Sequence, residues 1–362
     1  MNQLFRKYLL IPIFVTGFAV VQGQKTETLY LSGTGADDTK TWDFYCSDGM
    51  NSKKWATIEV PSCWEQQGFG AYNYGHVPFE ERVNETGLYK RNFDIPKNWS
   101  SQQVRLIFEG VMTDALVKIN GKSAGATHQG AFYQFEYDIS KLLKYGKENS
   151  IEVLVKKHSG NESINLAERK ADFWVFGGIF RPVYLEVKPK ENIQRVTIDA
   201  KSDGIFKADV YTSNLKKSDL LEVEVQSSVG KTVKTFSVET TGLITRIENK
   251  IENPLTWNSE YPNMYQAVFK LKSAGKTKFA RTSSKALSIE AVNLMKEMNM
   301  NAVRMSHYPP EKHFLEVCDS LGLFVLDELT GWQRPSYDEQ IGRKLLKELI
   351  ARDVNHPSIV LW

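Results

Sequence analysis

The chain has 362 residues, 46 basic and 43 acidic side chains, and a net charge of +3. This length allows two or three domains, and the balanced charge, without a run of Lys and Arg, argues against a nucleic-acid partner held by phosphate contacts. The three cysteines, Cys46, Cys63 and Cys318, form no C-x-x-C pair, which argues against a metal or redox site. Cys46 and Cys63 are expected as buried free thiols, and a disulfide in an oxidising compartment is the alternative.

The first 23 residues have the pattern of a secretory signal peptide. Arg6 and Lys7 precede an apolar stretch over residues 9–21, and small and polar residues follow at 22–24. The apolar stretch is shorter than the roughly 20 residues that a spanning helix needs. We therefore expect an exported protein, periplasmic or secreted, without stable membrane insertion; an uncleaved membrane anchor is the alternative.

Residues 25–188 are predicted to form a β sandwich of the jelly-roll kind. Short runs with alternating apolar and polar residues recur, and turn signals such as Asn120-Gly121 separate them. Many short strands joined by such turns are typical of this fold. The predicted strands cover residues 55–60, 104–111, 115–121, 150–157 and 181–189.

Residues 189–280 form a second β region. Alternating runs at about ten-residue spacing predict an immunoglobulin-like sandwich, with strands over residues 193–200, 204–213, 221–230 and 264–273. The region has no cysteine and no cluster of His, Asp or Glu. We interpret it as a spacer that fixes the angle between its two neighbours.

Residues 281–362 show the pattern of βα units. A helix is expected from Ser283 or Ser284 to about Met298, with Leu287, Val292, Met295 and Met298 on its inner side. Apolar runs over 301–310, 323–332 and 353–362 end in polar residues, and helical spacing separates them. The pattern predicts a parallel sheet, and a (β/α)8 barrel and a doubly wound sheet both fit it. In a barrel the strand ends would place four side chains at the active face: Arg304, His307, Asp327 and Glu328.

The motifs of the first and last regions resemble glycoside hydrolase family 2, which includes β-galactosidases and β-glucuronidases. The first region contains VPSCWEQQG, NETGLYKRNFDIP and DFWVFGGIFRPVYL, and the last contains NAVRMSHYPP, FLEVCDSLGLFVLDEL and RDVNHPSIVLW. The resemblance implies a mainly β chain: an N-terminal jelly-roll sugar-binding sandwich, an immunoglobulin-like sandwich, then a partial (β/α)8 barrel. It implies a carbohydrate partner, no cofactor, and hydrolysis of terminal β-linked sugars with retention, β-galactosidase activity foremost.

The same resemblance implies that the catalytic residues are missing from these 362 residues. In the family, the phrase matching NHPSIVLW runs on to a Gly-Asn-Glu that holds the acid/base, and the nucleophile comes later. The sequence stops at Trp362, so no catalytic residue and negligible hydrolysis are expected from this stretch alone. The first barrel strand, with its Gly-x-x-x-His motif, is also missing between Ala280 and Arg281.

Asp327 and Glu328 are the one adjacent carboxylate pair at a predicted strand end, but they cannot form a catalytic dyad. A retaining glycosidase places two carboxyl groups about 5 Å apart across the sugar. Neighbours on a strand point to opposite faces. We expect them to bond with Arg304 as an ion pair at the strand ends instead.

Asp172 is the implied sugar-binding residue of the first domain. It lies in ADFWVFGGIFRPV, where Gly177 and Gly178 allow a tight turn. In the family this loop reaches the barrel mouth and its aspartate bonds substrate hydroxyls, for which a carboxylate is a good acceptor. The alternative is that Asp172 caps a turn or pairs with Arg169 or Arg181.

The implied substrate-binding residues of the barrel are His307, Arg304, Glu328 and Trp332. A neutral His307 can donate to one hydroxyl and accept from another; a structural bond to the backbone beside Tyr308 is the alternative. Trp332 would stack on a sugar. It stands where some β-galactosidases carry a metal-ligand glutamate, so no metal site is expected.

Two other interpretations remain open. A jelly-roll sandwich also suits a non-catalytic carbohydrate-binding or scaffold protein, because fold does not fix function. A truncated gene product is the third possibility, since a few strands cannot close a barrel and would leave exposed edges.

Overall fold

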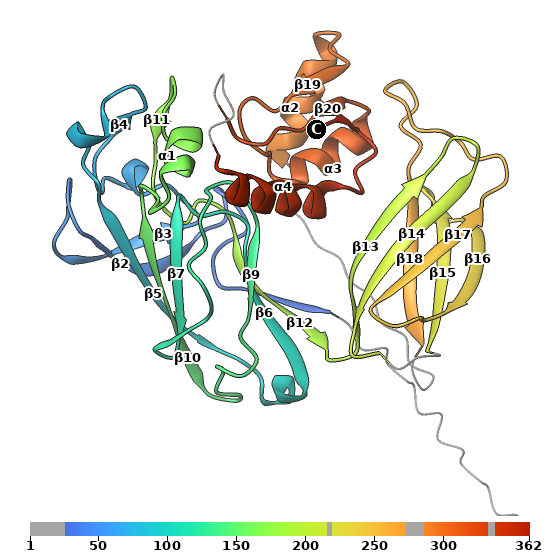
Figure 1. The fold of residues 1–362 in the computed structure, drawn as a ribbon, viewed down its shortest axis with the longest axis horizontal. Coiled ribbons are helices and arrows are strands. Elements are labelled where there is room, and N and C mark those ends of the chain that lie inside the picture. The colour runs from blue at the N-terminus through green and yellow to red at the C-terminus, as the bar shows by residue number, and fades with distance from the viewer. Residues whose placement is uncertain (1–25, 216–218, 273–285, 332–336) are drawn as a thin grey trace, which may run out of the picture.

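The computed structural model describes residues 26–215, 219–272, 286–331 and 337–362. Figure 1 shows three parts: a large β sandwich in blue to green, a smaller β sandwich in yellow, and a helical part in orange and red that lies between their upper ends. The predicted signal peptide lies outside the described residues. Within the described residues, no helix combines the length and the apolar character that crossing a bilayer requires.

The first part is a sandwich of two antiparallel sheets, as predicted. Strand alternation builds its core: β10 turns Ile151, Val153 and Val155 inward and leaves Glu152 and Leu154 only partly covered. The four-stranded sheet has the order β1 (Glu27–Tyr30), β12 (Val183–Pro189), β6 (Gln102–Phe108), β9 (Phe135–Asp138). The six-stranded sheet has the order β3 (Trp55–Val60), β2 (Lys40–Cys46), β5 (Thr86–Asp94), β10 (Glu148–Lys156), β7 (Asp114–Ile119), β8 (Lys122–Ser123).

Three short elements lie at one end of this sandwich, and sequence reasoning missed all of them. The strands β4 (Asn73–Tyr74) and β11 (Trp174–Val175) pair as a two-stranded ribbon. The helix α1 (Glu162–Glu168) is capped by the Asn161 side chain, which accepts from two backbone N–H groups. Figure 1 places these three elements at the upper end of the sandwich, the same end at which the helical part lies.

The second part confirms the predicted immunoglobulin-like sandwich. One sheet has the order β13 (Asn192–Ala200), β14 (Ile205–Ser213), β17 (Ile244–Lys250), and the other has β16 (Thr232–Glu239), β15 (Leu220–Ser227), β18 (Tyr265–Lys272). Val210, Val223 and Leu221 are at the centre of its core. The strands β16 and β17 were not predicted, and β16 has no fully buried residue to mark its alternation.

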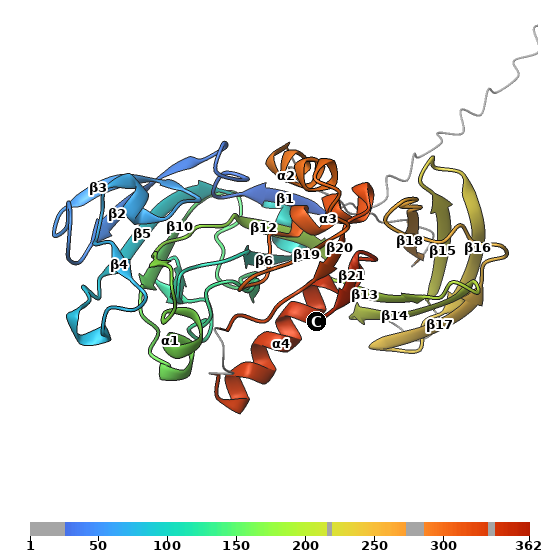
Figure 2. The same cartoon turned by 90° about the horizontal axis from the view of Figure 1, so that it is seen from above.

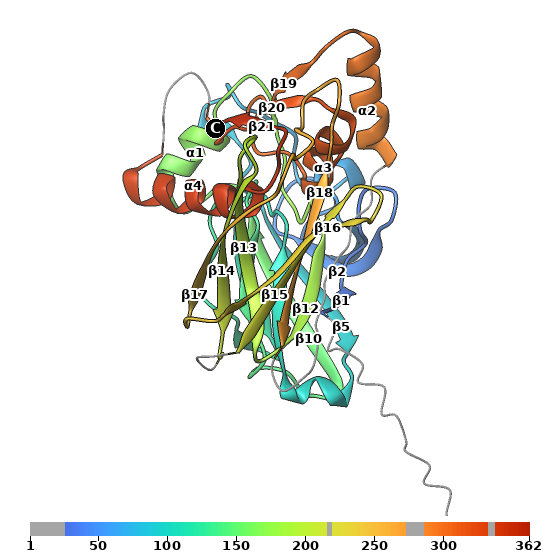
Figure 3. The ribbon, with the colours of Figure 1, turned by 90° about the vertical axis from the view of Figure 1, so that its right-hand side faces the viewer.

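The third part consists of βα units around a parallel sheet, as predicted. Its described residues form a partial barrel. Its elements are α2 (Ala286–Glu297), β19 (Ala302–Arg304), α3 (Lys312–Leu321), β20 (Phe324–Leu326), α4 (Glu339–Asp353) and β21 (Ile359–Leu361), with the strands in the order β19-β20-β21. Figure 2 shows α4 running between the first sandwich and the second, and Figure 3 shows it above the strands of the second. Leu345 and Leu349 of α4 are buried with Met112 and Tyr133 of the first sandwich.

The residues predicted for the inner face of α2 are confirmed at two positions, and the prediction is wrong at a third. Val292 is fully buried and Met295 packs against the same core. Met298 is 65% exposed, because the helix ends at Glu297 and the next residues turn away. The side chain of Leu287, the expected caps Ser283 and Ser284, and the junction of Ala280 with Arg281 lie outside the described residues.

Candidate functional site

The ends of β19 and β20 bring Arg304, His307 and Glu328 together. Arg304 donates to both carboxylate oxygens of Glu328, from Nε at 2.7 Å and from Nη2 at 2.9 Å. His307 Nδ1 lies 3.7 Å from Glu328 Oε1. The hydrogen bonds from Arg304 lower the pKa of Glu328, so this carboxylate is a fixed anionic acceptor at neutral pH.

Asp327 points to the opposite side of the strand and is buried. Burial, with the nearby Asp353 carboxylate, raises the pKa of Asp327 to about 7, although the Arg352 guanidinium acts in the opposite direction. The ion pair with Arg304 is therefore made by Glu328 alone. The two neighbouring carboxylates have different environments because the strand pleat separates them.

Arg304 and Glu328 line an open groove of about 750 Å³. Its other wall is the beginning of α4 together with the residues that follow β20, including Thr330, Gly331, Tyr337 and Asp338. The predicted platform Trp332 lies outside the described residues. No group of three or more His, Cys, Asp or Glu in the described ranges is arranged to hold a metal ion.

Asp172 is exposed on the loop that follows α1. Tyr74 Oη donates to its Oδ1 across 98 residues of sequence. Neither of the arginines considered as its partner takes that role: Arg169 donates to Thr113 and to the carbonyl of Phe176, and Arg181 donates to the carbonyls of Phe132 and Pro309. Asp172 is thus held at the surface by a tyrosine.

The β4–β11 ribbon carries aromatic side chains on its outer face. Trp174 pairs in register with Tyr74, and Tyr72 lies two residues earlier on the same side. The inner face carries Val175, which is buried, and Asn73, whose Nδ2 donates to the carbonyl of Val83 at 2.8 Å. Asn73 is thus a buried strand residue.

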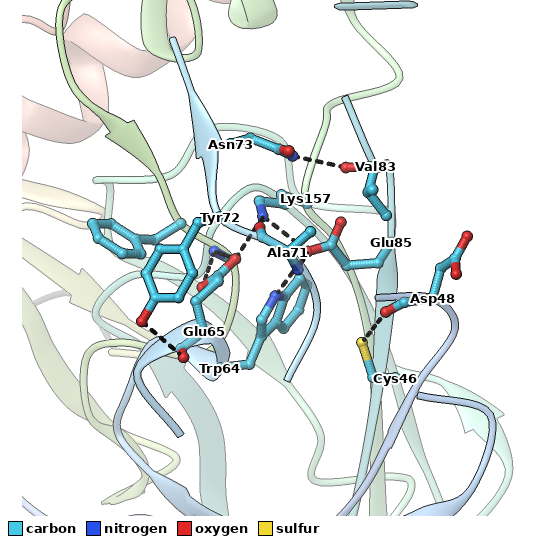
Figure 4. A network of polar contacts seen from close by, with 12 residues as sticks. Cys46, Asp48, Trp64, Glu65, Ala71, Tyr72, Asn73, Val83, Glu85 and Lys157 are labelled. Carbon is cyan, nitrogen blue, oxygen red and sulfur yellow. Dashed lines mark hydrogen bonds and ion pairs between the residues drawn. The ribbon is translucent and has the colours of Figure 1, made fainter. Parts of the chain in front are cut away.

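A buried ion network lies beneath the ribbon. Lys157 Nζ is 2.7 Å from Glu65 Oε1 and 2.8 Å from Glu85 Oε1, and all three side chains are fully buried. Glu85 Oε1 also accepts from the backbone N–H of Ala71 at 3.0 Å. Figure 4 shows Lys157 between Glu65 and Glu85, close to Ala71 and below Asn73, the first residue of β4. The network fixes the base of the ribbon, because a buried charge has a low energy only while it is paired.

Gly177 joins the Asp172 loop to the same network. Its N–H donates to both carboxylate oxygens of Glu65 at 3.1 Å. A Cβ on Gly177 would lie 2.1 Å from Cζ2 of Trp64. The glycine is needed here for the close approach of the loop to the indole ring. The next residue, Gly178, adopts φ +125°, which few other residues reach.

A chain of hydrogen bonds joins the first sandwich to the groove. Glu168 Oε1 accepts from Tyr337 Oη at 2.7 Å. Tyr337 Oη lies 3.3 Å from Tyr133 Oη, which bonds Thr330 Oγ1 at 3.3 Å. Both Thr330 and Tyr337 line the groove. The first sandwich thereby positions one wall of the groove, through residues far apart in the sequence.

The turn containing His307 is also held by the first sandwich. Arg181 Nη2 donates to the carbonyl of Pro309 at 2.9 Å. The ring of Tyr308 stacks on Phe132 with centroids 4.4 Å apart and planes 9° apart.

The three cysteines are free, with Cys46 and Cys318 buried and Cys63 partly buried.

Sequence reasoning missed the aromatic ribbon and the interdomain hydrogen bonds. The signal for the ribbon is the alternation of rings in AYNYG and in FWVF. No local signal marks Glu168 or Tyr337, because their bond spans 169 residues.

Two β sandwiches followed by βα units around a parallel sheet define a multidomain protein with a partial barrel. Three models of one family match almost the whole chain: the sugar-binding domain of glycosyl hydrolases family 2 at residues 29–189, a further family 2 domain at 191–285, and the family 2 TIM barrel domain at 275–362. The chain belongs to glycosyl hydrolase family 2.

Similar proteins carry the names of enzymes of this family. A β-galactosidase of Thermoanaerobacter pseudethanolicus is 29% identical, over 79% of this chain and 45% of its own length. A β-galactosidase of Priestia megaterium is 26% identical, over 98% of this chain and 43% of its own length. The chain thus spans less than half the length of these relatives.

Solved structures agree in fold. A β-glucuronidase from glycoside hydrolase family 2 superposes with a TM-score of 0.77 at 22% identity, over 95% of this chain and 43% of its own. The Bacteroides uniformis β-glucuronidase superposes with a TM-score of 0.72 at 21% identity, over 92% of this chain and 46% of its own.

Proposed function

We propose that the protein is a retaining glycoside hydrolase for terminal β-linked sugars, with β-galactosides as the first substrates to test. The observation that carries the proposal is the Arg304–His307–Glu328 cluster at the barrel strand ends, beside a groove, in a chain of family 2. Relatives named β-galactosidase support the choice of sugar.

The side chains of this cluster suit sugar hydroxyls. Glu328 is held by two bonds from Arg304, and its remaining lone pairs can accept from hydroxyl groups. His307 supplies an imidazole that can donate or accept. By the family pattern, Asp172 of the first sandwich would be a further acceptor for a sugar hydroxyl. These residues hold and orient the sugar; none of them is assigned the bond-breaking step.

We further propose that residues 1–362 alone bind sugar without cleaving it. Asp327 and Glu328 point apart and cannot act on the two sides of one glycosidic bond, and the family pattern places both catalytic glutamates after Trp362. The purified chain should therefore show no turnover of nitrophenyl β-galactoside or β-glucuronide above a buffer blank. Hydrolysis above that blank would contradict this proposal.

A non-catalytic carbohydrate-binding protein is the second candidate, and the exposed rings of Tyr72 and Trp174 favour it. Two measurements distinguish the hydrolase from the binding protein. One is calorimetry with galactose, and the other is a hydrolysis assay of the protein extended beyond Trp362. Turnover by the extended protein supports the hydrolase. Binding without turnover, with an active family 2 β-galactosidase as the positive control, supports the second candidate.

We also propose that the protein is exported. Residues 1–23 support this through their basic start and apolar stretch. Fusion of these residues to a reporter that is active only outside the cytoplasm should give signal. Substitution of the apolar stretch by polar residues should abolish that signal, and a reporter that stays silent in both forms contradicts export.

A further inference from the structure

We propose that Tyr72, Tyr74 and Trp174 form an aromatic platform that binds a second sugar unit, next to the one held by Asp172. The ligand is a neutral pyranose within an oligosaccharide. This inference rests on the proposed function and deepens it, because it assigns the substrate class as a glycan of two or more sugars rather than a small glycoside.

The three rings lie together on the outer face of the β4–β11 ribbon. Trp174 is 53% exposed and Tyr72 is 51% exposed. The centroid of Trp174 is 5.4 Å from that of Tyr74 and 6.0 Å from that of Tyr72. Isolated exposed rings are common on soluble proteins, but here Trp174 contacts both tyrosines edge to face, so the three rings form one aromatic patch that can bind a ligand.

The rings are fixed before any ligand arrives. Tyr72 Oη donates to the carbonyl of Glu65 at 3.0 Å, and Tyr74 Oη donates to Asp172. The Glu65 side chain is itself held by the buried Lys157 network. Binding to a pre-organised surface loses little side-chain entropy, so a small platform can contribute usefully to affinity.

The chemistry of the patch matches one face of a sugar. A pyranose has an apolar face of C–H groups, which packs on aromatic rings, and a hydroxyl edge, which needs acceptors. Tyr74 donates to Oδ1 of Asp172, and Oδ2 of this exposed carboxylate can accept from a sugar hydroxyl. The negative charge of Asp172 repels acidic sugars, and for this reason we assign a neutral one.

The platform is tested by comparing galactose with β-1,4-galactotetraose in calorimetric titrations of the purified chain. We expect the tetrasaccharide to bind about tenfold more tightly, since ring stacking adds to the contacts of the terminal sugar. Trp174→Ala should remove most of this tenfold gain and change galactose affinity less than about twofold.

The matched control is Trp55→Ala. Trp55 is 52% exposed and contacts Tyr45 with centroids 5.7 Å apart, but it lies on β3, away from the ribbon, so both affinities should stay unchanged. Tyr72→Phe keeps the ring and should keep binding, whereas Tyr72→Ala should weaken tetrasaccharide binding. Thermal unfolding of each variant shows whether the fold is intact.

The outcomes separate the platform from the proposed function. Equal wild-type affinity for the two sugars, or equal losses in Trp174→Ala and Trp55→Ala, overturns the platform. If the platform is overturned but Asp172→Asn weakens galactose binding, the proposed role of Asp172 in holding the terminal sugar is still supported. If neither sugar binds, both proposals are overturned.

Discussion

Asp327 and Glu328 are neighbours in the sequence, and the structure gives their carboxyl groups opposite properties. Glu328 is bonded to Arg304 and its pKa is lowered. Asp327 is buried beside Asp353, its Oδ2 has no hydrogen-bond partner among the described residues, and its pKa is raised to about 7. At the scale of the residue, environment rather than residue type decides which carboxylate is a permanent anion.

The raised pKa of Asp327 predicts a pH-dependent stability. An unfolded aspartate has a pKa of about 3.9, so between about pH 4 and pH 7 the folded state binds more protons than the unfolded state. The free energy of unfolding should therefore fall as the pH rises through this window, by at most about 4 kcal/mol, of which about 2–3 kcal/mol is lost between pH 5 and pH 8. Urea unfolding at pH 5 and pH 8 measures the decrease.

The variant Asp327→Asn should show a smaller decrease than the wild type, because it has no proton to lose at this position, whereas Glu348, whose pKa burial also raises to about 7, keeps its own contribution. The control Asp37→Asn, at an exposed loop position, should keep the wild-type pH dependence. Equal slopes for wild type and Asp327→Asn would show that another group is responsible.

The buried cation Lys157 should be essential to the stability of the first sandwich. Lys157→Met leaves the carboxylates of Glu65 and Glu85 buried without their partner, which costs about 3–5 kcal/mol in comparable sites. Lys90→Met is the control, because its pair with Glu152 is partly exposed and such pairs contribute about 0–1 kcal/mol. Chemical unfolding of both variants tests the prediction, and similar losses would contradict it.

At the scale of the element, the β4–β11 ribbon is a short structure that two tightly packed loops hold in place. Each strand has two residues, too few to be stable by pairing alone. The ribbon is positioned from below by the Lys157 network and by the contact of Gly177 with Trp64. Its aromatic face therefore depends on residues that never touch a ligand.

Gly177→Ala tests this dependence. The added Cβ overlaps the Trp64 ring, so we expect a loss of about 1–3 kcal/mol in unfolding free energy and weaker sugar binding through displacement of Asp172. Gly35→Ala is the matched control, since its Cβ would meet nothing within 4 Å. Thermal unfolding and calorimetry of both variants check the prediction, and a neutral Gly177→Ala would contradict it.

At the scale of the whole molecule, the third part is anchored on both sandwiches. Asn355 Nδ2 donates to the carbonyl of Val196 at 2.7 Å, and Trp257 Nε1 donates to that of Asp319 at 2.8 Å. On the other side, α4 buries Leu345 against the first sandwich. These contacts with both sandwiches stabilise the partial barrel.

Leu345→Ala should loosen this anchor. Truncation of a buried leucine costs about 2–5 kcal/mol, and the loss should appear as faster proteolysis and hydrogen exchange in α4, with the strands of the first sandwich unchanged. The neighbouring Leu346 is partly exposed, so Leu346→Ala should have little effect. Equal protease resistance of wild type and Leu345→Ala would contradict the anchoring role.

Much of the fold was predictable, because it depends on local patterns. Alternation over residues 55–60 predicts β3 exactly where it lies, and the runs at 150–157 and 193–200 predict β10 and β13 to within two residues. The spacing of Leu345 and Leu349 predicts the buried face of α4. The two-residue strands β4 and β11 and the two-turn helix α1 are too short to show their period.

The sequence by itself determined the order of the three parts, the alternation that builds their cores and the separation of Asp327 from Glu328, since each follows from the period of a strand or helix. Only the tertiary structure decided that Tyr74 holds Asp172, that Tyr337 bonds Glu168 and that three rings meet on one ribbon. These contacts join residues 98 and 169 positions apart. No local propensity specifies such pairs, because they form only when packing of the whole chain brings the segments together.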